Sequence, residues 1–138
     1  MDLATALEFV AERHHGVITT LKADGRPQLS NVAYALGGDG VIRVSVTDGR
    51  AKTANLRRDP RASLHVTRDD FYAYVVVEAT AELTPVAAEL SDATVDELVD
   101  YYRTVAGEHS DWDDYRRAMV ADRRLIVRLR PERAYGMV

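Results

Sequence analysis

The sequence contains no cysteine, which excludes disulfide bonds, thiolate metal ligands and cysteine nucleophiles. It has no apolar run of the roughly 18 residues that a membrane-spanning helix needs. The N-terminal stretch MDLATALEFVAERHH is too polar for a signal peptide. A formal net charge of −4 argues against a basic surface for nucleic acid. We therefore expect a cytoplasmic protein that binds neither nucleic acid nor a membrane.

Motifs for metal binding and catalysis are missing as well. There are four histidines and no HExxH pattern, and the adjacent His14 and His15 point about 100° apart on a helix, so they share one metal ion poorly. No GxSxG, GxGxxG or GxxxxGK[ST] motif occurs. We expect no metal site and no catalytic side chain, so in an enzyme a bound cofactor would carry the chemistry.

Acidic residues are concentrated between residues 92 and 114. Asp96 and Asp100 share one face of a predicted helix, as paired carboxylates for acid–base chemistry would. The interpretation we favour is the solvated side of amphipathic helices, with Asp92 and Asp111 at the N-cap positions.

Hydrophobic periodicity predicts mostly strands in these 138 residues, a length that fits one domain. Because most strands are joined by tight turns, the sheet should be antiparallel. We predict a mainly β fold with α elements, a single domain over 1–138 that forms an antiparallel barrel of six or seven strands with peripheral helices. The predicted helices are 3–14, 51–58, 86–90, 92–106 and 111–122. The predicted strands are 17–22, 28–36, 41–47, 61–68, 72–84 and 124–130, where Pro131 interrupts the last and 134–138 is its candidate continuation.

Only two of the 18 basic residues are lysines, and one of them, Lys52, lies in TDGRAKTANLRRDP, residues 47–60. Arg50, Lys52, Thr53 and Asn55 cluster at the start of a predicted helix, where free backbone N–H groups and the helix dipole favour an anion. The strand before it adds hydroxyls at Ser45 and Thr47. This pattern predicts a phosphate site, and the alternative is a solvated basic turn.

A second polar feature interrupts an otherwise apolar strand in GRPQLSNVAYAL, residues 25–36. Ser30, Asn31 and Tyr34 would hydrogen-bond a planar heterocycle if this strand borders a cleft. Alternatively, Ser30 and Asn31 lie on the solvent face or in a bulge.

The order of these segments resembles a known family. GRPQLSNVAYAL, GVIRVSVTDGRAKTANLRRDPRASLHV, YVVVEATAELT and RLIVRLRPERAYGM are similar to the pyridoxamine 5′-phosphate oxidase-like superfamily of split β-barrel flavoproteins. The resemblance is narrower to its short members, the flavin/deazaflavin oxidoreductases of group B, which use coenzyme F420. It extends from about Leu7 to Gly136.

The resemblance implies a homodimer with two cofactor sites at the interface and a hydride transferred from reduced deazaflavin to a conjugated small-molecule substrate. The cofactor phosphate would lie on Arg50, Lys52 and the helix start, and the ring against residues 28–32. The implied cofactor-binding residues are Gln28, Ser30, Asn31, Val32, Ser45, Thr47, Arg50, Ala51, Lys52, Thr53 and Asn55.

FMN is the alternative cofactor, because it also presents a phosphate. F420 carries a polyglutamate tail, for which the candidate cations are Arg26, Arg57, Arg58 and Arg61. A non-catalytic cofactor carrier or sensor on the same fold, and an interaction domain without a ligand, are the other functional alternatives.

Overall fold

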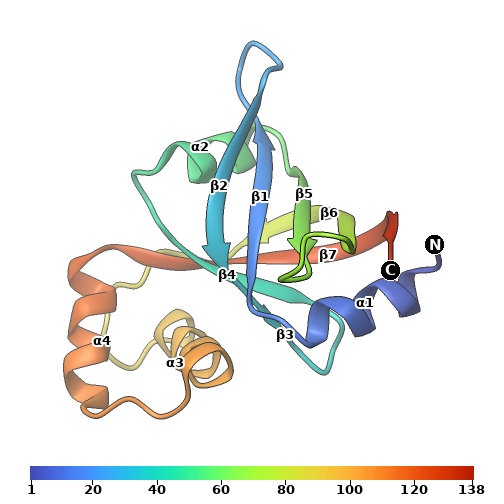
Figure 1. The fold of residues 1–138 in the computed structure, drawn as a ribbon. Helices are drawn as coiled ribbons and strands as arrows, with labels where there is room; N and C mark the ends of the chain where they lie inside the picture. Colours follow the sequence, from blue (N-terminus) through green and yellow to red (C-terminus); the bar gives the residue numbers. More distant parts are fainter.

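The computed structural model describes residues 1–138 as a curled antiparallel sheet with four helices around it (Figure 1). The helices are α1 (Leu3–Ala11), α2 (Ala51–Arg58), α3 (Ala93–Ala106) and α4 (Trp112–Ala121). The strands are β1 (His15–Leu21), β2 (Pro27–Ala33), β3 (Ala35–Leu36), β4 (Ile42–Thr47), β5 (Arg61–Thr67), β6 (Tyr74–Leu83) and β7 (Arg124–Met137).

The sheet closes on itself at one corner, at Tyr34. Its strand order is β2-β1-β5-β6-β7-β4-β3, so β2 and β3 are opposite edges, yet only Tyr34 separates them along the chain. Tyr34 is fully buried, its hydroxyl donates to the Val10 carbonyl at 2.7 Å, and its N–H donates to the His14 carbonyl at 2.8 Å. From this corner β2 and β4 run on without pairing, which leaves a split between them.

Two apolar clusters hold the elements in place. The larger one fills the barrel with inward-facing residues of alternating strands, such as Val44, Val46 and Leu125, and α1 adds Ala6 and Val10. The smaller cluster packs α3 and α4 onto the outer face of β7, mainly against Ile126. The two helices therefore stand beside the split and cover one outer face of the sheet (Figure 1).

The predicted fold class is confirmed: seven antiparallel strands form a split barrel with peripheral helices. The predicted helix at 86–90 is wrong. The carboxylate of Asp92 accepts hydrogen bonds from the backbone N–H groups of Ala88 and Glu89, at 2.9 and 3.0 Å, and holds this segment in an irregular turn. The same side chain caps α3 by accepting from the Val95 N–H.

Two predicted boundaries also need correction. The first helix ends at Ala11 rather than at residue 14, because His15 already pairs with Ala33 in the sheet. Pro131 does not interrupt the last strand, since β7 runs from Arg124 to Met137 and a register shift near Pro131 absorbs the proline. No helix in the structure combines the length and apolar character required to span a bilayer.

Gly136 lies opposite Val75 in the β6–β7 pairing, where there is no room for a side chain. Its φ is 153°, and an added Cβ would collide with the carbonyl oxygen of Tyr74 and lie 2.9 Å from the Cα of Val75. We expect Gly136→Ala to lower the free energy of unfolding by about 2 kcal/mol or more, measured by chemical denaturation. Gly38→Ala is the matched control, because nothing lies within 4 Å of its added Cβ. Equal stabilities of the two variants would contradict this close packing.

Candidate functional site

A cavity of about 490 Å³ lies in the split between β2 and β4. Three groups of residues line it: the unpaired edge of β2, the end of β4 with the start of α2, and the facing sides of α3, α4 and β7. They are Asn31, Val32, Ala33, Ser45, Thr47, Arg50, Lys52, Tyr101, Tyr102, Tyr115, Met119 and Arg124. Backbone groups on the two unpaired edges lack sheet partners and are available to a ligand.

The floor of the cavity is built by strand alternation. Val44 and Val46 point into the barrel core, so Ser45 and Thr47 present their hydroxyls on the opposite face. Thr47 is directly opposite Arg124 in the β4–β7 pairing, which places both side chains on this face. Thr47 also fixes α2, since its carbonyl accepts a hydrogen bond from the Thr53 hydroxyl at 2.8 Å.

Three cations meet at one end of the cavity without a carboxylate partner. Arg50, Lys52 and Arg124 are in none of the fifteen ion pairs of the structure, although most of the other arginines are. The neighbouring carboxylate of Asp48 is bound instead by Arg57 at 2.7 Å and Arg123 at 3.0 Å. The cavity end is therefore positively charged and uncompensated.

Electrostatics at this end favour an anionic ligand. Burial, together with the nearby charges of Arg50 and Arg124, lowers the pKa of the Lys52 ammonium. Arg124 Nε is buried and has no hydrogen-bond partner. Arg50 is the N-cap residue of α2 and makes no side-chain cap, so the helix start keeps free N–H groups beside the cations. A phosphate here would neutralise the charge and satisfy the donors.

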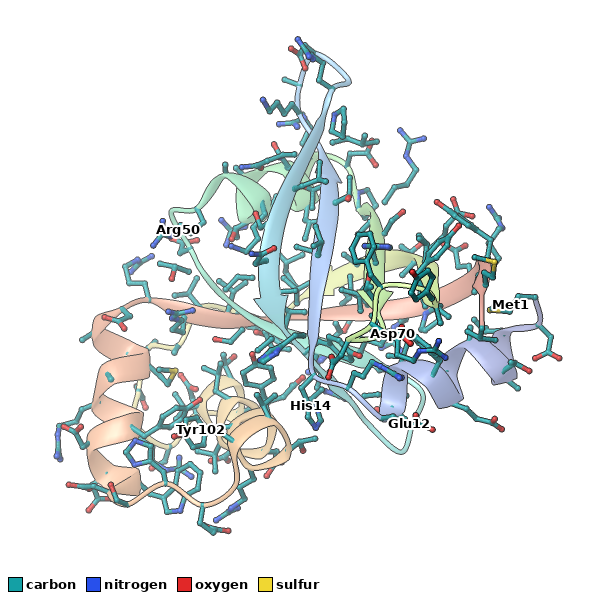
Figure 2. The ribbon with its side chains drawn as sticks, viewed as in Figure 1. Met1, Glu12, His14, Arg50, Asp70 and Tyr102 are labelled. Carbon is teal, nitrogen blue, oxygen red and sulfur yellow. The ribbon has the colours of Figure 1, made fainter.

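The opposite wall is aromatic. Tyr101, Tyr102 and Tyr115 project from α3 and α4, and Met119 completes the surface. Figure 2 shows Arg50 in the loop before α2 and Tyr102 between the two late helices. Burial raises the pKa of the Tyr115 hydroxyl to about 12, so this tyrosine is neutral at physiological pH. Such a wall suits a flat, uncharged ring.

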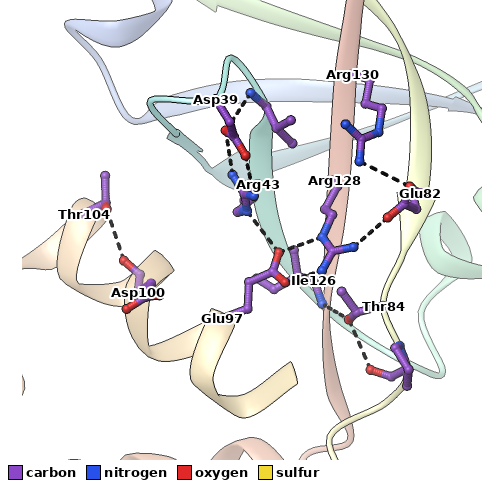
Figure 3. Close-up of polar contacts among 12 residues, drawn as sticks. Asp39, Arg43, Glu82, Thr84, Glu97, Asp100, Thr104, Ile126, Arg128 and Arg130 are labelled. Atoms are coloured by element: carbon purple, nitrogen blue, oxygen red, sulfur yellow. Dashed lines mark hydrogen bonds and ion pairs between the residues drawn. The ribbon is translucent and has the colours of Figure 1, made fainter. Parts of the chain in front are cut away.

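Tyr101 also bridges the split. Its hydroxyl donates to the carbonyl of Ala33 on β2 at 2.8 Å, and its own helix packs over β4. An ion-pair network fixes that helix to the sheet: Glu97 accepts from Arg43 at 3.0 Å and from Arg128 at 2.9 Å (Figure 3). The aromatic wall is thus held rigidly against the strand edges.

The structure brings six of the eleven predicted cofactor-binding residues together on this cavity. They are Asn31, Val32, Ser45, Thr47, Arg50 and Lys52. The other five lie away from its surface: Gln28, Ser30, Ala51, Thr53 and Asn55. Of these, Ala51 is an exposed residue in the first turn of α2, and Ser30 is half-buried on the strand face opposite to Asn31.

Asn55, Gln28 and Thr53 make hydrogen bonds within the protein. Asn55 is buried and its amide donates to the Thr20 hydroxyl at 3.1 Å and to the Gln28 side-chain oxygen at 2.8 Å. These bonds tie α2 to β1 and β2 at the open end of the barrel. Ser30 and Asn31 lie on opposite faces of β2, and of the two only Asn31 lines the cavity.

Sequence reasoning missed half of the lining residues. These are Ala33, Tyr101, Tyr102, Tyr115, Met119 and Arg124. Three tyrosines within otherwise acidic helices were the available signal. Nothing local marks Arg124, which is one of sixteen arginines.

Comparison with known proteins assigns the fold and then the family. A family model described as pyridoxamine 5′-phosphate oxidase matches residues 3–137. The chain therefore belongs to the pyridoxamine 5′-phosphate oxidase family, and the resemblance to that superfamily is confirmed.

Three solved structures extend the comparison. A conserved hypothetical protein from Mycobacterium tuberculosis is 26% identical with a TM-score of 0.76, over 99% of this chain and 84% of that one. A protein named F420 reductase is 25% identical with a TM-score of 0.72, over 93% of this chain and 94% of that one. A heme binding protein from Mycobacterium smegmatis is 25% identical with a TM-score of 0.71, over 96% of this chain and 52% of that one.

The structural role of Asn55 predicts a loss of stability on its replacement. Asn55→Ala removes three hydrogen bonds, to Thr20, to Gln28 and from Arg58, and leaves the Gln28 side-chain oxygen without this donor, so we expect the free energy of unfolding to fall by about 1–3 kcal/mol. Asn31→Ala is the control, because Asn31 is exposed at the cavity and should leave the unfolding curve unchanged. If Asn55→Ala kept its stability but lost affinity for a phosphorylated cofactor, Asn55 would be a ligand after all.

Proposed function

We propose that this protein is an F420-dependent oxidoreductase, which reduces a conjugated small molecule with a hydride from reduced deazaflavin. The observation that carries the proposal is the cavity itself, with three unpaired cations at one end and a tyrosine wall along the side. A phosphorylated ring cofactor has matching parts, a charged phosphate and a flat heterocycle. The likeness to a protein named F420 reductase over nearly the whole of both chains supports the choice of cofactor.

FMN is the competing cofactor, because its phosphate would fit the same cations. The four arginines considered for the F420 tail differ in whether their side chains already have partners in the structure. Arg57 pairs with Asp48, Arg61 pairs with Asp59 at 2.8 Å, and Arg58 donates to the Leu21 carbonyl. Of the four, only Arg26 makes neither an ion pair nor a side-chain hydrogen bond, so it is available to a polyglutamate tail as it stands.

In this proposal the residues of the chain bind and orient the cofactor, and none of them donates or accepts a proton in the reaction. Arg50, Lys52 and the start of α2 hold the phosphate. The edge of β2 at 31–33 offers its remaining backbone groups to the polar rim of the ring, because the Ala33 carbonyl is already bound to Tyr101. When bound, reduced F420 supplies the hydride. Burial raises the pKa of Tyr101, so its hydroxyl stays protonated and keeps its bond to Ala33. Solvent supplies the proton that completes the reduction.

A titration with F420 and FMN tests this function directly. We expect F420 to bind more tightly than FMN, with a change in F420 fluorescence, and Lys52→Gln to weaken binding by on the order of 2–3 kcal/mol because it removes one of three cations. Lys22→Gln is the matched control, since Lys22 is the other lysine and is exposed far from the cavity.

Other outcomes would favour the alternatives. A protein that purifies yellow and ignores F420 would be an FMN protein. Binding of F420 without turnover on a panel of enones and tetrapyrroles would indicate a carrier. Because one similar structure is named heme binding protein, haemin is a further arm of the titration, and a Soret band shift without any F420 response would reject the proposal.

We further propose a homodimer that completes the cavity. Large apolar side chains are exposed on the outer face and at the far end of the sheet, among them Leu29, 61% exposed, and Tyr135, 52% exposed. A second cavity of about 590 Å³ opens on that face at His15 and His65, and it shares residues 31–33 with the first. A second copy that covers the outer face would therefore lie directly beside the candidate site.

The dimer predicts a mass near twice 15.4 kDa in light scattering. Leu29→Arg should produce a monomer and weaken cofactor binding at least tenfold, because a buried charge opposes association. Leu90→Arg is the control, since Leu90 is exposed in the turn before α3, away from this face. A wild-type protein that stays monomeric at micromolar concentration would contradict the proposal.

A further inference from the structure

We infer that Arg124 is a third ligand of the bound anion, placed where the phosphate end of the cavity meets the tyrosine wall. The inference rests on the proposed function in taking the ligand to be a phosphorylated ring. Neither the predicted site nor the resemblance includes Arg124. It is assigned here from its position, its charge and its partners.

The position of Arg124 is fixed by the sheet. It is the first residue of β7 and pairs directly with Thr47, whose side chain faces the cavity. The adjacent Leu125 points into the barrel core and is fully buried, so alternation sends the Arg124 side chain to the opposite side. Arg124 therefore reaches the cavity from its floor, whereas Arg50 and Lys52 reach it from the start of α2.

Arg124 is unsatisfied in the free protein. Its Nε–H is buried and has no acceptor, and its guanidinium makes no ion pair. The charged and tyrosyl groups that line the cavity beside it are Lys52, Arg50, Tyr101, Tyr102 and Tyr115, and no carboxylate is among them. The carboxylate of Asp48, which follows Thr47, is already bound by Arg57 and Arg123. A buried donor without an acceptor and a third positive charge both destabilise the fold.

A bound anion would remove both causes of destabilisation, the unpaired buried donor and the repulsion among the cations. A phosphate oxygen accepts from the planar guanidinium and offsets the repulsion among the three cations. The neighbouring tyrosines place a ring, attached to that phosphate, within reach of the same residue. The ligand class that fits Arg124 is thus a phosphate joined to a flat heterocycle.

Arg124→Met tests the assignment because it keeps the length and apolar volume of the side chain and removes its charge. We expect two opposite changes. The unliganded variant should unfold at a higher temperature than wild type, and its Kd for the cofactor should rise tenfold or more. An arginine that only supports the fold would give a lower unfolding temperature, so that result would overturn the inference, as would an unchanged Kd.

Two further variants complete the experiment. Arg124→Lys keeps the charge and loses the fork of donors, so it should show no rise in unfolding temperature and a Kd between those of wild type and Arg124→Met. Arg117→Met is the matched control, because Arg117 is exposed on α4 and does not line the cavity. It should leave the cofactor Kd unchanged.

Inorganic pyrophosphate separates this inference from the proposed function. We expect it to raise the unfolding temperature of wild type more than that of Arg124→Met. If neither F420 nor FMN binds and pyrophosphate still shows this dependence, the proposed function fails and the role of Arg124 stands. If F420 binds equally to wild type and Arg124→Met, the role of Arg124 fails and the proposed function stands. If none of the three ligands binds, both are wrong.

Discussion

The candidate site depends on the way the sheet curls into a barrel. Its two edge strands, β2 and β3, are joined by a single residue, so the two edges meet at that corner. Tyr34 links β2 to β3 and is buried with both of its polar groups satisfied. Beyond it β2 and β4 diverge, so each keeps an unpaired edge. An open edge is usually a liability that proteins cover. Here α2, α3 and α4 cover it from the sides, and the remaining gap is the cavity.

The charge distribution follows from the same arrangement. Asp48 lies only two residues before Arg50, but Arg57 and Arg123 already bind its two oxygens. The carboxylate of Glu97 is likewise committed, to Arg43 and Arg128 (Figure 3). Acidic residues thus serve to fix helices and loops, and the three cations of the cavity are left without partners. Three unpaired cations so close together lower the stability of the free protein.

Elements with strong local signals could be predicted from the sequence. The strand predicted at 41–47 and the helix predicted at 51–58 depend on short stretches of sequence, and the structure has β4 and α2 there. The helix predicted at 86–90 was wrong because the Asp92 side chain accepts hydrogen bonds from backbone N–H groups of this segment. Helical periodicity does not reveal such a contact. The continuity of β7 past Pro131 depends on its pairing with β6, which is likewise nonlocal.

The residues of the candidate site also differ in whether local sequence or nonlocal packing determines their place. Arg50 and Lys52 could be identified because a cation pair at a helix start is a local anomaly. Asn55 shares that segment, yet it points toward Thr20 and Gln28, and only the packing of α2 on the barrel decides this. Tyr101 and Arg124 come from elements about fifty and seventy residues further along the chain. Their convergence with Lys52 requires the whole strand order, in particular the pairing of β4 with β7. Two cations of the charged end could therefore be identified in one segment, whereas the tyrosine wall and the third cation form only once the barrel has closed.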